Sequence, residues 1–164
     1  MSAITVTVEA TIGSTIRRDG VPDAPSDAEQ DDARGAAGWP VGKCRVADTL
    51  GDDGRPVEAL VLMREPAVAG ADVRAWPVGV LHLEGPQRAV DEVLCVAEAP
   101  CFADLVDVSD LPRWHAEPEV WAVALSRLSR GPAYRVAACG PVREADDLLS
   151  AAHHTHLQLT GCLE

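Results

Sequence analysis

Strand-like patterns dominate the first part of the chain, and helix-like patterns dominate its end. Short apolar or alternating runs rich in β-branched residues are typical of strands. Such runs occur at residues 4–9, 59–63, 73–83, 93–97 and 134–139. We therefore expect about five strands, most of them before residue 100.

Two later segments repeat apolar residues at three- and four-residue spacing, which indicates amphipathic helices. The first covers residues 117–129 and ends before Gly131-Pro132, and the second covers residues 142–154. Strands followed by two helices predict an α+β fold. The expected architecture is a small five-stranded antiparallel β-barrel, OB-like, with two C-terminal helices packed on it.

Residues 18–38 interrupt this pattern. They are rich in Asp, Ala, Gly and Pro and contain almost no large apolar residue, so they cannot supply a core face. We expect a long, mobile excursion there. The chain of 164 residues has a suitable length for one domain, and we expect a single domain over residues 1–164.

The charge of the chain excludes two classes of partner. There are 14 Lys and Arg against 26 Asp and Glu, a formal net charge of −12, which repels nucleic acids and anionic membranes.

The N-terminus alternates where a signal peptide would be continuously apolar, and no segment is long enough to span a bilayer. The five cysteines include no C-x-x-C pair, which suits reduced thiols. We expect a cytoplasmic protein.

Two stretches resemble the soluble family I inorganic pyrophosphatases. They are T-L-G-D-D-G-R-P-V-E-A-L-V-L at 49–62 and W-P-V-G-V-L at 76–81. The family hallmark is D-G-D-P-x-D leading into an apolar strand, followed by P-x-x-x-G and R-P-V-G-V-L at this spacing. Smaller matches follow the same order, at Glu9, Gly13 and Ser14, at Trp39-Pro40, and at Asp110-Leu111-Pro112. The resemblance implies the pyrophosphatase fold over most of the chain and a homo-oligomer.

The resemblance also implies several Mg²⁺ ions, which carboxylates hold and which generate a hydroxide and bridge the pyrophosphate oxygens. The family's metal-binding acids and the lysine after them fall here on Asp53, Arg55, Glu58, Gly85, Val90 and Glu92. Glu84 and Asp91 lie one position from the later acid pair, so a shifted register could restore two carboxylates. A shift of one residue on a strand, however, points a side chain to the opposite face.

Five residues are predicted to bind the substrate: Glu9, Arg17, Asp19, Trp39 and His82. In the resemblance, Arg17 replaces a lysine, Asp19 a glutamate and Trp39 a tyrosine. His82 lies where the family usually has a long polar residue that faces the pocket. It is a candidate acid or base, and the alternative is an ordinary polar strand residue.

Four residues are predicted to be catalytic: Asp53, Arg55, Glu58 and Lys43, which replaces a second tyrosine. The Arg55 guanidinium stays charged and cannot bind Mg²⁺. At ion-pair distance it would repel the ion by on the order of 4 kcal/mol at an effective dielectric near 20. Arg55 could instead lie between Asp53 and Glu58, either in place of a metal ion or as the structural salt bridge of a dead site.

The main functional hypothesis is therefore a pyrophosphatase-fold protein that has lost metal-dependent pyrophosphate hydrolysis. Its pocket would perform metal-independent acid/base chemistry (elimination, isomerisation or cyclisation) on a small organic substrate of specialised metabolism, with no cofactor and no metal ligand. One alternative is a divergent Mg²⁺-dependent inorganic pyrophosphatase that hydrolyses diphosphate to two phosphates. Another is a non-catalytic binding or regulatory subunit. The expected partners are a small-molecule substrate and further copies of the chain.

Overall fold

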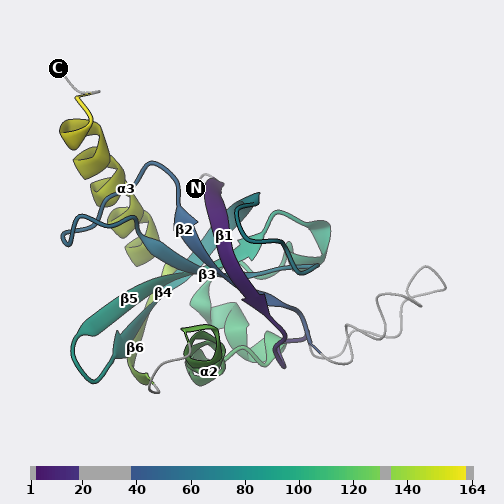
Figure 1. The fold of residues 1–164 in the computed structure, drawn as a ribbon. Helices are drawn as coiled ribbons and strands as arrows, with labels where there is room; N and C mark the ends of the chain where they lie inside the picture. The colour runs from purple at the N-terminus through teal and green to yellow at the C-terminus, as the bar shows by residue number, and fades with distance from the viewer. Residues whose placement is uncertain (1–2, 19–37, 130–133, 162–164) are drawn as a thin grey trace.

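The computed structural model describes residues 3–18, 38–129 and 134–161 (Figure 1). The expected excursion at 18–38 lies almost entirely outside these described residues. Within them, no helix is long and apolar enough to cross a membrane.

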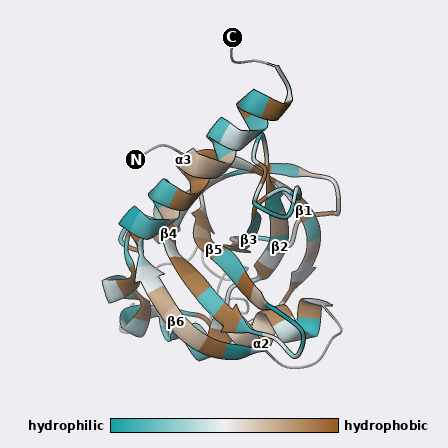
Figure 2. Cartoon of the chain, turned by 90° about the vertical axis from the view of Figure 1, so that its left-hand side faces the viewer, coloured by the Kyte–Doolittle hydropathy of each residue, from teal (hydrophilic) through white to brown (hydrophobic). Residues whose placement is uncertain are grey.

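Six strands form one sheet, and five of them close into a ring. The strands are β1 (Ile4–Ile12), β2 (Val41–Val46), β3 (Glu58–Leu62), β4 (Asp72–Glu84), β5 (Ala89–Ala97) and β6 (Arg135–Pro141). Their order is β1-β2-β3-β5-β4-β6, and β1 also pairs with the start of β4. The strands β1, β2, β3, β5 and β4 therefore form a closed barrel, seen end-on in Figure 2, and β6 extends the sheet from β4.

The predicted five-stranded barrel is confirmed, with two differences in its strands. The strand β2 was not expected, and the expected last strand, β6, lies outside the ring. The barrel is also not wholly antiparallel, because β3 and β5 pair in parallel, with Ala59 opposite Val93 and Leu62 opposite Val96. Parallel strands run in the same direction, so β3 and β5 begin at the same end of the barrel.

Both predicted helices are confirmed. The helix α2 spans Pro118–Ser129, and α3 spans Val142–Leu159, five residues further than expected. Two short 3₁₀ helices, η1 (Pro100–Phe102) and η2 (Val108–Trp114), precede α2. They and α2 pack below the barrel in Figure 1, whereas α3 crosses it on the other side.

The strands bury both of their faces, because each face packs into a different apolar cluster. One cluster is bulky and joins strand leucines such as Leu60 and Leu94 to Trp114 and Trp121 from the η2–α2 segment. The other is built from small residues, mostly Val, Ala and Cys, and includes Ala145, Leu149 and Ala152 of α3. Alternation along β3 and β5 assigns successive residues to the two clusters in turn. A polar side chain that replaces an apolar one in this pattern is therefore surrounded by core.

Candidate functional site

A row of five charged side chains crosses neighbouring strands of the barrel. We call Glu9, Lys43, Arg45, Glu58 and Glu92 the charged row. Arg45 on β2 lies opposite Glu58 on β3. On the other side of β3, the pairing of Ala59 with Val93 brings Glu58, the residue before, level with Glu92 on β5. The row thus follows from sheet register, and it lies at the end of the barrel where β3 and β5 begin.

Two ion pairs account for four members of the charged row. The Lys43 ammonium lies 4.0 Å from a Glu58 carboxylate oxygen, and both side chains are half-buried. The Arg45 guanidinium lies 3.0 Å from a Glu9 carboxylate oxygen. Each pair joins one cation to one carboxylate, so Glu92 is the member without a matching cation.

Glu92 is the buried member of the row. Its exposed fraction is 1%, and neither carboxylate oxygen has a hydrogen-bond partner among the described residues. Burial raises its pKa well above the ordinary value. The negative charge of Glu58 raises the pKa further, as does a hydrogen bond that the protonated Glu92 carboxyl can donate to Glu58, while Lys43 partly opposes this. Burying a carboxyl group without a partner costs free energy, so such a group is rare in a core.

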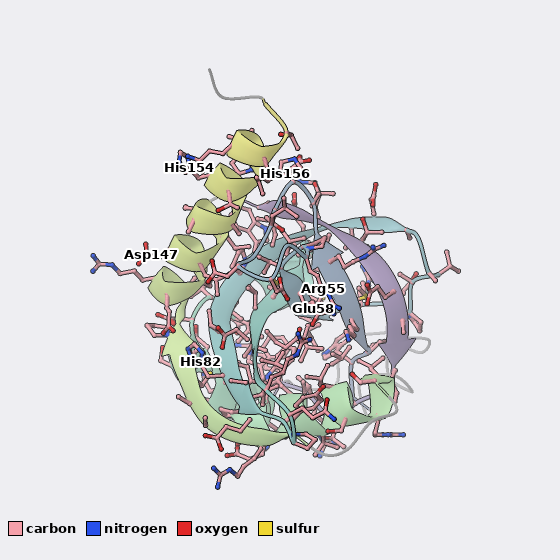
Figure 3. All side chains as sticks on the ribbon, turned by 60° about the vertical axis from the view of Figure 1, so that its left-hand side comes forward. Arg55, Glu58, His82, Asp147, His154 and His156 are labelled. Carbon is pink, nitrogen blue, oxygen red and sulfur yellow. The ribbon has the colours of Figure 1, made fainter. Side chains whose placement is uncertain are left out.

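A pocket of about 400 Å³ opens beside Glu58. One wall is the segment from Leu50 to Glu58, the second is the start of β5, and the third is an apolar stretch of α3 that includes Leu148 and Ala152. Two arginines, Arg55 and Arg88, line it together with four acids, Asp52, Asp53, Glu58 and Asp91. Figure 3 shows Arg55 and Glu58 close together at this end of the barrel. The pocket has the size of a small-ligand site and supplies charges of both signs.

Arg55 does not occupy the position expected for it between two carboxylates. The backbone N–H of Arg55 donates a hydrogen bond to Asp53 Oδ1 at 3.0 Å, which closes a local turn. The Arg55 side chain is exposed and forms no ion pair within the described part of the chain. Asp53 instead lies 4.0 Å from the Arg88 guanidinium. The pocket thus brings Asp53, Arg55 and Glu58 together without the predicted ionic bridge, because the turn directs Arg55 toward solvent.

His82 lies beside the pocket and does not line it. Its Nδ1 is 2.7 Å from Asp91 Oδ1, and its Nε2 is 2.5 Å from Glu144 Oε1 on α3. Figure 3 places His82 near the first turn of α3, apart from Arg55 and Glu58. Because Asp91 does line the pocket, His82 contacts the site through that carboxylate.

The other predicted substrate-binding residues are spread over the fold. Trp39 packs edge-to-face on Phe102 in the bulky cluster, with ring centroids 5.4 Å apart. Arg17 is exposed and its backbone N–H donates to the Trp114 carbonyl. Asp19 lies outside the described residues. Glu9, by contrast, belongs to the charged row.

A shifted register does not bring Glu84 to the site. The Glu84 carboxylate pairs with Arg135 across the β4–β6 edge, and Asp91 binds His82. The site acid that sequence reasoning missed is Glu92, which was assigned only as the replacement of a lysine. The signal that could have identified it is parallel pairing of β3 with β5, because that pairing aligns Glu58 with Glu92.

The donor set at this end of the barrel fits a hard cation such as Mg²⁺. Within the described residues, no three His, Cys, Asp or Glu side chains already surround a metal position. Mg²⁺ does not need such a cage, since it keeps several water ligands and usually binds one or two carboxylates plus substrate phosphates. Glu58 and Asp53 line the same pocket, and the unpartnered Glu92 lies level with Glu58.

Comparison with known families matches residues 44–156 to the sequence model described as inorganic pyrophosphatase. An inorganic pyrophosphatase of Aeropyrum pernix is 40% identical over 70 residues, which is 41% of this chain and 40% of the relative. One of Leifsonia xyli is 29% identical over 106 residues, 63% of this chain and 65% of the relative. The chain therefore spans less than two thirds of the length of these curated relatives.

Solved structures agree in fold. The inorganic pyrophosphatase of Helicobacter pylori has a TM-score of 0.67 at 23% identity, over 94% of both chains. That of Thermus thermophilus has a TM-score of 0.65 at 19% identity, over 94% of this chain and 91% of the other. At these identities the likeness shows that the chain has the pyrophosphatase fold.

These matches correct two expectations. The hypothesis that hydrolysis has been lost and replaced by acid/base chemistry on an organic substrate is wrong, because the family and the named relatives are inorganic pyrophosphatases. The expectation of no cofactor is wrong for the same reason, since this family works with Mg²⁺. Both expectations rested on the absence of the family's acids at positions 55, 85 and 90, where this chain has Arg55, Gly85 and Val90. They did not consider that Glu92 supplies another carboxyl group at the same end of the barrel.

Proposed function

We propose that this chain, which belongs to the inorganic pyrophosphatase family, hydrolyses inorganic pyrophosphate to two phosphates with the help of Mg²⁺. The observation that carries the proposal is the family match over residues 44–156, which includes the pocket and three members of the charged row, Arg45, Glu58 and Glu92. The sequence relatives that match it are themselves enzymes of this name.

The side chains of the pocket suit a small polyanion that arrives with a cation. Arg55 and Arg88 can donate paired N–H groups to phosphoryl oxygens on one side of the pocket. The carboxylates Glu58 and Asp53 would hold Mg²⁺ on the other side. When bound, Mg²⁺ supplies positive charge to the phosphoryl oxygens and makes a water molecule more acidic. Lys43, which is half-buried beside Glu58, pairs with that carboxylate and so helps to orient it.

Phosphate release from pyrophosphate tests the proposal. The wild-type chain should turn over at an ordinary enzyme rate, about 1–1,000 per second, with Mg²⁺ present, and EDTA should abolish the reaction. A wild-type chain that releases no phosphate at any Mg²⁺ concentration would contradict the proposed function.

Arg55→Asp makes the test more specific, since it restores the family's second acid and removes a cation from the pocket. We expect the Mg²⁺ concentration for half-maximal rate to fall about tenfold, which corresponds to about 1.4 kcal/mol. Arg127→Asp on α2 makes the same charge change at an exposed position that does not line the pocket, and it should leave that concentration unchanged. Equal effects of the two variants would indicate general electrostatics and no specific role for position 55.

Two further parts of the proposal concern the whole protein. We propose a homo-oligomer, as the family resemblance implies, and a cytoplasmic location, which the net charge of −12 and the spacing of the cysteines support. Sedimentation of the purified chain at several concentrations would test the first, and fractionation of its native cells would test the second.

A further inference from the structure

When Glu92 is ionised, it is a buried carboxylate that the fold itself does not satisfy. With 1% of the residue exposed, water cannot solvate the group, and neither oxygen accepts a hydrogen bond within the described part of the chain. Its neighbours in the charged row are already paired with each other, Lys43 with Glu58 and Arg45 with Glu9. Loss of the Glu92 proton removes the hydrogen bond to Glu58, so the partner that the resulting carboxylate lacks is an additional cation.

The surroundings of Glu92 determine which cation fits. Glu58 lies level with it on the neighbouring strand, so two carboxylates face the same space. Carboxylate oxygens are hard ligands, and they favour Mg²⁺ or Mn²⁺ over softer ions. Two described cysteines, Cys44 and Cys95, are close enough for the charge of Glu92 to act on them, but both are buried thiols. Burial raises the pKa of Cys44 to about 12 and that of Cys95 well above its ordinary value, so these thiols are poor ligands.

The acids that the family motif leads one to expect are absent at three positions, Arg55, Gly85 and Val90. Glu92 stands where the family resemblance has a lysine. A carboxylate has thus been gained on β5 in the same chain that has lost carboxylates on the adjoining segments.

We propose that Glu92, together with Glu58, forms a divalent-cation site that replaces the missing acids, so that the metal centre has moved toward the start of β5. This inference rests on the proposed function for its biological purpose, but the site can be measured without pyrophosphate. Glu92 holds the ion from within the core, and Glu58 holds it from the pocket side.

Calorimetric titration of Mg²⁺, and Mn²⁺ binding followed by electron paramagnetic resonance, test the site on the full chain without substrate. Substitution of a group that only orients a metal ligand typically lowers metal affinity about 10- to 100-fold. Because Glu92→Gln removes a proposed ligand itself, it should weaken binding by at least about tenfold. Glu92→Asp keeps a carboxylate and should retain part of the affinity. Glu92→Lys, which restores the family residue, should abolish binding at this position.

Glu98→Gln is the matched control. Glu98 follows the end of β5, is exposed and pairs with Arg74, so its substitution removes one carboxylate far along the same strand. It should leave metal affinity unchanged. Glu92→Gln should fold without metal, because an amide replaces an unpartnered carboxyl of the same shape, and far-ultraviolet circular dichroism would verify this. If Glu92→Gln does not fold, Glu92→Asp and Glu58→Gln are measured instead, and both variants should bind the metal ion more weakly than the wild type.

Equal metal affinity of the wild type and Glu92→Gln would overturn the inference, as would a wild type that binds neither ion. These outcomes differ from failure of the proposed function. A wild type that hydrolyses pyrophosphate while Glu92→Gln binds Mg²⁺ normally contradicts only the metal position. A wild type that binds Mg²⁺ through Glu92 but releases no phosphate contradicts only the reaction.

Discussion

His82 is held by carboxylates on both sides, one from β5 and one from α3. Partial burial lowers the pKa of His82, but the hydrogen bonds and negative charges of Asp91 and Glu144 outweigh this effect and raise the pKa above its ordinary value. The protonated ring donates to both carboxylates and so ties the first turn of α3 to the barrel. A neutral ring carries a single N–H and can donate to only one of them.

The His82 contact should make stability depend on pH. A raised pKa in the folded state means that the contribution is complete below the ordinary histidine value of 6.5 and is lost as pH rises through the folded-state value. The loss of unfolding free energy in His82→Gln should thus be largest near about pH 5 and smallest near about pH 9, as measured by urea unfolding. His154→Gln, an exposed change on α3 (Figure 3), should show no such trend. A pH-independent loss in His82→Gln would contradict a charged His82.

Glu92 illustrates why sequence reasoning misjudged the site at the level of single residues. The pattern of β5 was recognised only from Val93, because glutamate is unfavourable in strands and almost never fully buried. A motif comparison then recorded Glu92 as a lost lysine. Its relation to Glu58 depends on which strand lies beside β3, and a single sequence does not contain that information. Asp53, Arg55 and Glu58 could be predicted to meet because they belong to one continuous segment.

Among the elements, helices were easier to predict than strands for a physical reason. The stripe of apolar residues on α2 or α3 is a property of that helix alone, and both helices appear as expected. The strand β2 has Gly42, Lys43 and Arg45 in place of a continuous apolar run, because the charged row passes through it. The parallel pairing of β3 with β5 joins segments about thirty residues apart, with β4 between them in sequence.

The strand β4 depends on a glycine where it bends between two partners. Its register shifts between Pro77 and Gly79, and Gly79 pairs with Pro141 of β6. A Cβ atom at Gly79 would lie 2.5 Å from Val108 Cγ1 and 2.8 Å from the Gly140 carbonyl oxygen, which is backbone and cannot move freely. The strand can therefore pack closely on β6 and η2 only without a side chain at this position.

We expect Gly79→Ala to lower the unfolding free energy by about 1–3 kcal/mol, the usual cost of overpacking a close contact. Chemical denaturation would measure it. Gly13→Ala is the control, because a Cβ there has no neighbour within 4 Å, and its effect should stay within about 0.5 kcal/mol. A neutral result for Gly79→Ala would mean that β6 can move away from β4 without cost.

For the molecule as a whole, a bound divalent cation should raise stability, because the folded chain binds it and the unfolded chain does not. At about a hundredfold excess of Mg²⁺ over its dissociation constant, the gain is about 2.7 kcal/mol. For a chain of this length that corresponds to a rise in Tm of about 5–10 °C. Differential scanning calorimetry at fixed ionic strength, with KCl as the reference, would measure the shift. A Tm that follows ionic strength alone would indicate only screening of the charge of −12.

The closed ring has a consequence for the order in which a ribosome delivers its strands. β5 is the last of the five to be synthesised, yet it belongs between β3 and β4, which are made before it. Until Ala97 has left the exit tunnel, β3 and β4 each have an edge with unsatisfied backbone groups, which is the kind of surface that pairs with other chains. A translational pause between residues 85 and 97 would prolong that exposure. Closure of the barrel and arrival of Glu92 at the site are consequently a single event in the biosynthesis of this protein.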